Sequence, residues 1–310
     1  MKTMSKLMQR SLVAITASTL VLAAVPAQAQ QTPQAQQASA PWALVDEALG
    51  RAGTTQPDGV RRYSFPRSDL NVRLDDVAIM PALALGSWVA FQSIGDEQVM
   101  VMGDLVLTHD EVNPVMSALL DAGLSVTALH NHLLRSSPAT MYMHIGGHGQ
   151  ARDVAVAIAS ALAKSRTPLG APSTAPASST ALDLDTAALD RIMESPGRAS
   201  GGVYHFSFPR PESVTHDGMP APATMGTGTA LNFQPLGGGR AAITGDFVLR
   251  ADEVGPVMRA LRTANIEVTA LHNHMLDDEP RLFFMHFWAQ ADANALARGL
   301  RSALDEMAEK

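Results

Sequence analysis

The heptapeptide VTALHNH occurs twice in this 310-residue chain, at Val126–His132 and again at Val268–His274. The match extends on both sides at a constant offset of 142 residues, so that Val99–Ile145 aligns with Ala241–Phe287 without a gap. Of these 47 aligned positions, 24 carry the same residue. A match of this length indicates that the chain contains an internal duplication.

The duplication predicts two domains joined by a linker. Upstream of the gapless match, the motif SFPR of Ser64–Arg67 returns at Ser207–Arg210. The stretch Pro168–Thr180 reads PLGAPSTAPASST, and its Pro, Ser and Ala content is typical of a linker. We therefore expect a repeat domain over residues 42–167, a linker over 168–181 and a second repeat domain over 182–310. The two domains should fold alike and meet through an extensive contact.

The first 29 residues have the organisation of a secretory signal peptide. Lys2, Lys6 and Arg10 form a positive segment, and an apolar stretch too short to span a bilayer follows over residues 12–24. Ala27-Gln28-Ala29 is a small-x-small cleavage site. We therefore expect cleavage near Ala29, a disordered tail over residues 30–41, and a periplasmic or secreted protein without a membrane span. An uncleaved membrane anchor is the alternative.

Composition excludes several classes of function. Hydrophobic residues make up 46% of the chain and charged residues 17%, which suits buried cores better than disorder. Removing the first 29 residues leaves 20 basic and 30 acidic groups, a balance that disfavours nucleic acid as a partner. The chain has no cysteine, which excludes disulfides, thiolate nucleophiles and cysteine-ligated metal centres.

Periodicity predicts the same order of elements in each half. In the first half we expect a short opening helix, a β-hairpin, a helix, two strands and a closing helix, over residues 43–51, 86–107, 108–122, 125–133, 141–145 and 150–164. Antiparallel strands followed by a β-α-β-β-α unit predict an α+β fold, with two tandem homologous α/β-sandwich domains. A ferredoxin-like core is one topology that fits this order.

Histidines are the most distinctive residues that the duplication retains. Each H-x-H pair lies in a predicted strand, where residues two apart share a face. A third histidine follows 12 residues later, on the neighbouring strand of a predicted hairpin. If the pairing register has even parity, the third ring shares the face of the pair; a slip of one residue would reverse it. The six residues are His130, His132 and His144, and His272, His274 and His286.

Three imidazoles on one face suit a zinc ion with an open fourth position. Zinc lowers the pKa of bound water to about 7, which makes hydroxide available. The same donors suit copper(II), and Met143, Met275 and Met285 nearby would suit copper(I). We favour zinc over copper. A metal-free histidine cleft and a structural polar network are the alternatives to a metal site.

Repeated carboxylates are the second group of candidate site residues. Asp104 and Asp246 each follow a glycine within or at the end of a strand. Each carboxylate could orient a ligand imidazole or act as a general base on bound water, the catalytic role assigned here. Capping of local backbone N–H groups is an equal alternative. The acidic pairs at 110–111 and 252–253 are better explained as first-turn helix residues.

These motifs resemble a known family. GDLVLTHDEVNPVMSALLDAG, VTALHNHLL and MYMHIGGHG in the first half, with GDFVLRADEV, ALHNHML and FFMHFWA in the second, are similar to the LppY/LpqO-type family of exported bacterial proteins. The resemblance covers nearly the whole mature chain. It implies a tandem architecture of a domain of unknown function, and it implies no reaction. Some relatives are lipoproteins, and this chain lacks the cysteine that lipidation requires.

Three functions therefore compete. The first is an exported metal-dependent hydrolase or lyase that acts on a small molecule or a cell-envelope substrate. The second is a periplasmic copper- or zinc-handling protein without catalysis. The third is a metal-free, ligand-binding envelope protein. A carboxylate beside an open metal position favours the first, and a methionine sulfur closing the site favours copper handling.

Overall fold

The structure is a computed structural model that describes residues 41–170 and 182–307. The predicted signal peptide, the tail up to residue 40 and linker residues 171–181 lie outside the described residues. In the part of the chain that is described, no helix is long and apolar enough to cross a membrane.

The first repeat is built on one six-stranded antiparallel sheet with the order β1-β2-β5-β6-β8-β7. Its helices are Trp42–Leu49 (α2), Pro81–Ala84 (α3), His109–Asp121 (α4) and Ala151–Leu162 (α5). Its strands are Thr54–Thr55 (β1), Arg61–Pro66 (β2), Arg73–Leu74 (β3), Val77–Ala78 (β4), Gly86–Gly95 (β5), Gln98–Thr108 (β6), Ser125–His130 (β7) and Thr140–Gln150 (β8). Strands β3 and β4 form a separate small ribbon.

The second repeat has the matching sheet β15-β17-β14-β13-β10-β9. Its helices are Thr186–Met193 (α6), the 3-10 turn Ala223–Met225 (η1), Ala251–Thr263 (α7) and Ala293–Asp305 (α8). Its strands are Arg198–Ser200 (β9), Val203–Phe208 (β10), Thr215–His216 (β11), Met219–Pro220 (β12), Thr229–Gly237 (β13), Arg240–Leu249 (β14), Glu267–His272 (β15), Asp278–Glu279 (β16) and Phe283–Asp292 (β17). The predicted tandem α+β fold is confirmed.

Each half contains a split β-α-β unit. Strands β6 and β7 both pair antiparallel with β8, so they run parallel to each other with β8 between them and α4 as the crossover. This is the central arrangement of a ferredoxin-like sheet. The strand on the other side of β6 is β5, which precedes the unit in sequence and joins it through the predicted hairpin.

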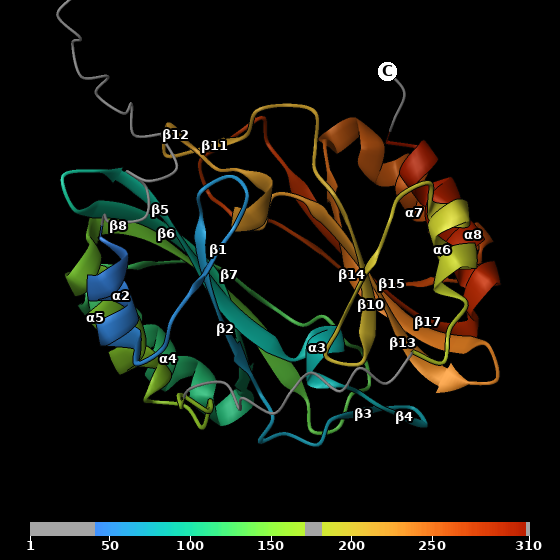
Figure 1. Ribbon diagram of the computed structural model, residues 1–310, viewed down its shortest axis with the longest axis horizontal. Helices are drawn as coiled ribbons and strands as arrows, with labels where there is room; N and C mark the ends of the chain where they lie inside the picture. Colours follow the sequence, from blue (N-terminus) through green and yellow to red (C-terminus); the bar gives the residue numbers. More distant parts are fainter. Residues whose placement is uncertain (1–40, 171–181, 308–310) are drawn as a thin grey trace, which may run out of the picture.

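The two sheets lie between two layers of helices (Figure 1). Helices α2, α4 and α5 cover the outer face of the first sheet, and α6, α7 and α8 cover that of the second. Strand β6 has apolar side chains on both faces of the sheet. Its odd-numbered residues Val99 and Val101 pack with the helices, while Met100 and Met102 pack with residues of the second repeat. Asp104 is an even-numbered residue of this strand and therefore lies on the inner face.

The contact between the repeats is extensive, as the short linker predicts. Two buried clusters mix apolar residues from both halves, one around Tyr142 and Trp288 and another around Met102 and Phe284. The Gln234 side chain of the second repeat makes two hydrogen bonds to the backbone of the first repeat. Its Oε1 accepts from the N–H of Met80 at 2.8 Å, and its Nε2 donates to the carbonyl of Ala78 at 2.8 Å.

Buried ion pairs fix the start of α4 and of α7. Arg67 contacts Glu111 at 2.7 Å and donates to the carbonyl of Val106 at 2.7 Å. Glu111 also accepts from the backbone of Thr108, which completes a capping box. Arg210 and Glu253 repeat the arrangement in the second half. The predicted helix-start role of the acidic pairs therefore holds for Glu111 and Glu253.

Two predicted boundaries differ from the structure. Strand β7 ends at His130, so His132 lies just beyond it rather than within a strand that reaches residue 133. Strand β8 runs on through Gly146 and Gly149 to Gln150, well beyond the predicted end at Ile145. The extension has a tertiary cause: β6 pairs with β8 along its whole length, from Gln98 opposite Gln150, and this pairing overrides the low strand propensity of glycine.

Candidate metal site between the two repeats

Strand register places the third histidine of each repeat on the face of the first. His130 lies opposite Tyr142, and Tyr142 and His144 are two apart on β8, so His130 and His144 share the inner face. The second repeat has the same register, with His272 opposite Phe284 on the strand that carries His286. This is the even parity that the three-histidine prediction required.

The six rings form one cluster rather than two separate trios. His130 stacks on His272 with 3.5 Å between ring centroids, across the contact between the repeats. His132 stacks on His286 at 3.6 Å, and the equivalent pair His144 and His274 stacks at 3.7 Å. Because the cross-repeat pairs match in this way, a local pseudo-twofold axis passes between His130 and His272. The six histidines named from the sequence thus lie together, and their meeting across the repeats was not predicted.

The two predicted carboxylates lie among the rings. Asp104 stands directly opposite His144 on the neighbouring strand, and Asp246 stands opposite His286. Asp104 Oδ2 is 3.8 Å from His132 Nε2, and Asp246 Oδ2 is 3.3 Å from His274 Nε2.

Four groups of side chains have ligand atoms within 4.8 Å of one another. Two groups mix the repeats and two contain an aspartate with two histidines of the same repeat. They are His130, His132, His272 and His286; His144, His272 and His274; Asp104, His132 and His144; and Asp246, His274 and His286. None consists of the three histidines of one repeat alone. The described residues therefore offer nitrogen and oxygen donors together.

Several ring nitrogens are buried without a hydrogen-bond partner in the described part of the chain. His286 Nδ1 donates to the carbonyl of Gly245 at 2.8 Å, and His144, whose Nε2 has no partner, has a hydrogen bond to the backbone of Gly103. Because a carbonyl only accepts, the bond of His286 places its proton on Nδ1 and leaves the Nε2 lone pair free. The unpartnered atoms are His130 Nδ1 and the Nε2 atoms of His144, His272, His274 and His286.

Burial sets the charge state of the cluster. Burial lowers the pKa of His272 to about 4 and that of His286 to about 3, so these rings are neutral and available as ligands at neutral pH. Burial raises the pKa of Asp104 to about 7, and burial together with the charge of Asp104 raises the pKa of Asp246 well above its usual value. Neutral imidazoles carry a free lone pair, and a cation bound among them would favour the ionised form of the two carboxyl groups.

The surroundings of the two aspartates differ. The Arg62 guanidinium lies 3.9 Å from the ring centroid of Trp88, donates to the carbonyl of Thr224 at 2.8 Å and interacts electrostatically with Asp104. Trp88 itself stands opposite Asp104 on β5. The residue opposite Asp246 is Ala230. Arg62 was not predicted as a neighbour of the site, because it lies outside the gapless match and in no recognisable motif.

Two of the three methionines named as copper(I) donors, Met143 and Met285, face away from the cluster. Met143 and Met285 alternate with the site residues along β8 and β17, and both are buried in the cores under the helices. Met275 is buried in the apolar cluster around Phe284. The sulfur atoms of Met143 and Met285, which as ligands would favour copper handling, are therefore buried among apolar residues of the cores.

A surface hollow reaches the edge of the cluster at His272. Leu271, Asn273, Leu276, Arg281 and Phe283 line it with that ring. Leu271 and Leu276 are largely exposed, which leaves an apolar rim beside a candidate metal ligand.

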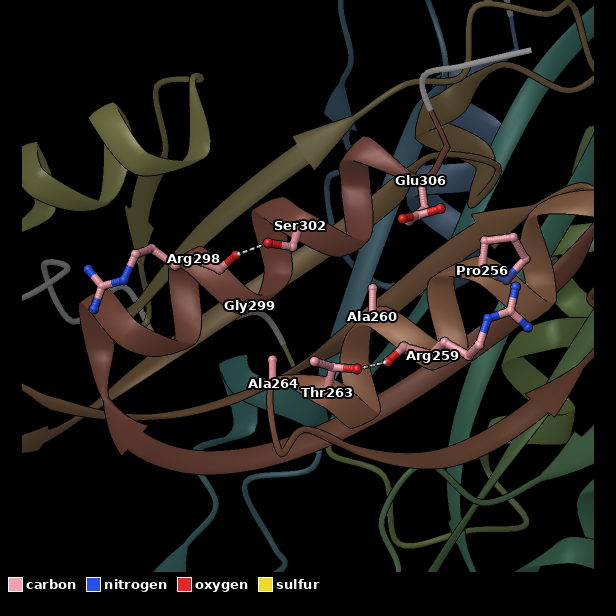
Figure 2. Close-up of a pocket in the computed structure, with 9 residues that line it drawn as sticks. All are labelled: Pro256, Arg259, Ala260, Thr263, Ala264, Arg298, Gly299, Ser302 and Glu306. Carbon is pink, nitrogen blue, oxygen red and sulfur yellow. Dashed lines mark hydrogen bonds between the residues drawn. The ribbon is translucent and has the colours of Figure 1, made fainter.

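A second hollow lies on the far side of the helices, between α7 and α8 (Figure 2). Arg259 and Arg298 line it but point away from each other. The hydroxyls of Thr263 and Ser302 donate to carbonyls of their own helices, at 2.9 and 3.0 Å. This groove brings no set of polar groups together.

The chain belongs to the family described as Domain of Unknown Function (DUF1259), whose model matches it twice, over residues 43–164 and 187–306. No curated protein matches the chain. Among solved structures, the chain is similar to a trimeric bacterial microcompartment shell protein, PduB, at 11% identity, covering 83% of this chain and 90% of that one with a TM-score of 0.20. It is also similar to EtuB from Clostridium kluyveri at 9% identity, covering 82% and 88%, with a TM-score of 0.20.

Proposed function

We propose that this protein is an exported metal-binding protein, that its metal site is the histidine cluster between the repeats, and that the bound metal serves hydrolysis or a related lyase reaction. The observation that carries the proposal is the set of buried ring nitrogens without hydrogen-bond partners. Buried polar atoms are normally satisfied. Rings with such unpartnered nitrogens, whose ligand atoms lie within 4.8 Å of one another in groups of three or four, form the arrangement that a cation completes.

Zinc is the metal that the donors favour. The cluster offers neutral imidazole nitrogens and carboxylate oxygens, which are zinc ligands in both structural and catalytic sites. The nearby methionine sulfurs pack into the cores, which argues against copper(I). The backbone hydrogen bonds of His144 and His286 are the outer contacts typical of ligand histidines.

Hydrolysis is favoured over storage by the carboxylates and by the hollow at His272. A bound zinc ion would supply Lewis acidity and lower the pKa of water toward neutrality. Asp104 or Asp246 would accept a proton from that water when it is not itself a ligand. The apolar rim at Leu271 and Leu276 would hold the uncharged part of a small molecule or cell-envelope substrate against the site.

Metal handling without catalysis is the second candidate. It is favoured by the burial of His144, His274 and His286, which lie away from the surface hollow. Buried ligands slow the exchange of a metal with solvent, as a storage or transfer protein requires.

We also propose that the protein is exported and that it is related to LppY/LpqO-type proteins. The positive segment, the short apolar stretch and the Ala27-Gln28-Ala29 site support secretion to the periplasm or beyond. The repeated motifs support a kinship with LppY/LpqO-type exported proteins. Mass spectrometry of protein from the producing cell should give an N-terminus at Gln30, and a full-length chain retained inside the cell would contradict export.

Metal analysis of the purified mature protein tests the proposed function. After chelation and reconstitution with zinc, elemental analysis should find bound zinc in the wild type and none in His144→Ala/His286→Ala. The matched control is His109→Ala/His148→Ala, which removes two exposed histidines outside the cluster and should keep the metal. Wild-type protein that takes up neither zinc nor copper would leave the metal-free ligand-binding function in place.

Activity separates the two metal-dependent candidates. Zinc-loaded protein should hydrolyse members of a panel of carboxylic and phosphoric ester substrates, and the metal-free form should not. Tight zinc binding without hydrolysis of any substrate would favour metal handling.

A further inference from the structure

Two of the four donor groups repeat each other residue for residue. Asp104, His132 and His144 come from the first repeat, and the residues 142 positions later are Asp246, His274 and His286. Each group lies within one repeat and combines one carboxylate with two imidazoles. Two imidazoles and one carboxylate are a complete protein ligand set for a catalytic metal with open positions.

Local geometry supports each set as a site. The carboxylate stands directly opposite one of its histidines on the neighbouring strand, Asp104 opposite His144 and Asp246 opposite His286. The second histidine brings its Nε2 to 3.8 Å from Asp104 and to 3.3 Å from Asp246. Ligands about 2.1 Å from a shared ion lie roughly 3–4 Å apart, so small side-chain adjustments suffice.

The remaining two histidines lie between the sets. The rings of His130 and His272 stack on the pseudo-twofold axis. The ring of His130 lies 5.0 Å from that of His132 and 5.6 Å from that of His286, so it neighbours a member of each set. His272 likewise neighbours a member of each set, because its ring lies 5.1 Å from that of His274 and 5.7 Å from that of His144.

One ion would leave half of these donor side chains unused. A zinc ion takes four ligands in its usual geometry, whereas the cluster holds six imidazoles and two carboxylates. Two ions would each take one aspartate and two histidines of one repeat, which leaves an open position on each ion, with His130 and His272 between the two sets. Two dications also compensate both carboxylates within the buried space.

We propose that the cluster binds two divalent metal ions, one in each repeat, with His130 and His272 between them. This inference rests on the proposed function. It adds the number of bound metal ions and places one ion in each repeat. Two ions held by these two sets would supply Lewis acidity from both repeats to a substrate bound between them. The structure thereby assigns the reacting centre to the contact between the repeats, so neither repeat alone contains it.

Metal stoichiometry of single-repeat variants tests the proposal on the full mature chain. Elemental analysis and zinc titration should give two ions per wild-type chain. Asp104→Asn and Asp246→Asn should each bind one, and the double variant should bind none tightly. The matched control Asp110→Asn, in an exposed first-turn acid outside the cluster, should keep two ions.

His132→Gln and His274→Gln provide a second pair in case an aspartate variant fails to fold. Circular dichroism and thermal unfolding report folding independently of metal. One ion per folded wild-type chain, or the loss of all metal from a folded single-repeat variant, would overturn the two-ion proposal and leave the proposed function standing. Wild-type chain without any metal would overturn both.

Discussion

The two repeats carry the same donor residues in the same strand positions but surround them differently. In the first, Asp104 faces Trp88 and the Arg62 guanidinium; in the second, Asp246 faces Ala230. At the helix starts, Thr108 in the first repeat corresponds to Arg250 in the second, which adds a cation beside Glu212 and Glu253. The two repeats therefore share their candidate ligands but differ in the residues that surround them. The candidate ligands converge from both repeats in the same strand positions, while the residues beside Asp104 and Asp246 differ.

The largest expected difference between the repeats concerns their buried ion pairs. Arg67→Met leaves Glu111 buried without its bidentate partner, and we expect a loss of about 3–5 kcal/mol of unfolding free energy. Arg210→Met should cost less, because Arg250 remains 3.5 Å from Glu253. Urea unfolding of the two variants measures the difference.

Arg67→Met/Glu111→Leu is the control for that prediction. Removing both charges should recover much of the stability, because the penalty comes from the unpaired carboxylate rather than from the lost pair. Equal losses in Arg67→Met and Arg210→Met would show that Arg250 does not compensate.

Metal removal should affect both repeats together. Ligand at one hundred times its dissociation constant stabilises a folded state by about 2.7 kcal/mol. Chelation should therefore lower the thermal midpoint of the wild type and leave that of His144→Ala/His286→Ala unchanged. Hydrogen exchange should rise in both β7 and β15; an increase confined to one strand would break the symmetry proposed for the site.

Acidification should destabilise the metal-free protein. Burial holds the pKa of the six cluster histidines below the ordinary value of about 6.5, so only the unfolded chain takes up protons as pH falls through that value. The stability they contribute is present above pH 6.5 and is lost below it.

The two aspartates oppose this trend. Their folded pKa values are raised, so their contribution grows as pH falls from about 7 toward 4. Six histidines outweigh two carboxyls, and we expect a net loss on the order of 2 kcal/mol between pH 7 and 6. His144→Phe and His286→Phe should reduce this slope equally if the two halves of the cluster are equivalent. Thermal midpoints at several pH values give the slope.

The smallest predicted effect concerns Arg62. Its positive charge near Asp104 opposes a dication at the first-repeat site, so Arg62→Met should tighten zinc binding there by about tenfold, or about 1.4 kcal/mol. The measurement is zinc titration in the Asp246→Asn background, where only the first-repeat site remains. In the Asp104→Asn background, the same substitution should leave affinity unchanged. Weaker binding in the first case would show that Arg62 helps to hold the site instead.

The sequence alone determined the duplication, the order of elements and the histidines and aspartates of the candidate site. Gapless repetition of HNH and of a third histidine selected His144 and His286 without any structure, because chemistry-bearing residues that survive in both copies stand out against diverged neighbours. Strand periodicity placed each H-x-H pair on one face. The predicted strand over residues 141–145 was too short for β8, because pairing with a long neighbouring strand is a tertiary property.

Only the tertiary structure decided how the two copies meet. Hairpin parity, which the sequence left open, depends on loop geometry and a β-bulge between Val126 and Ala128. The stacking of His130 on His272 and the approach of Arg62 to Asp104 depend on packing between segments far apart in the chain. Periodicity reports which face of an element is buried, and it carries no information about which other surface covers that face. For this reason the sequence predicts two sets of ligands, and only the packed sheets join them into one site.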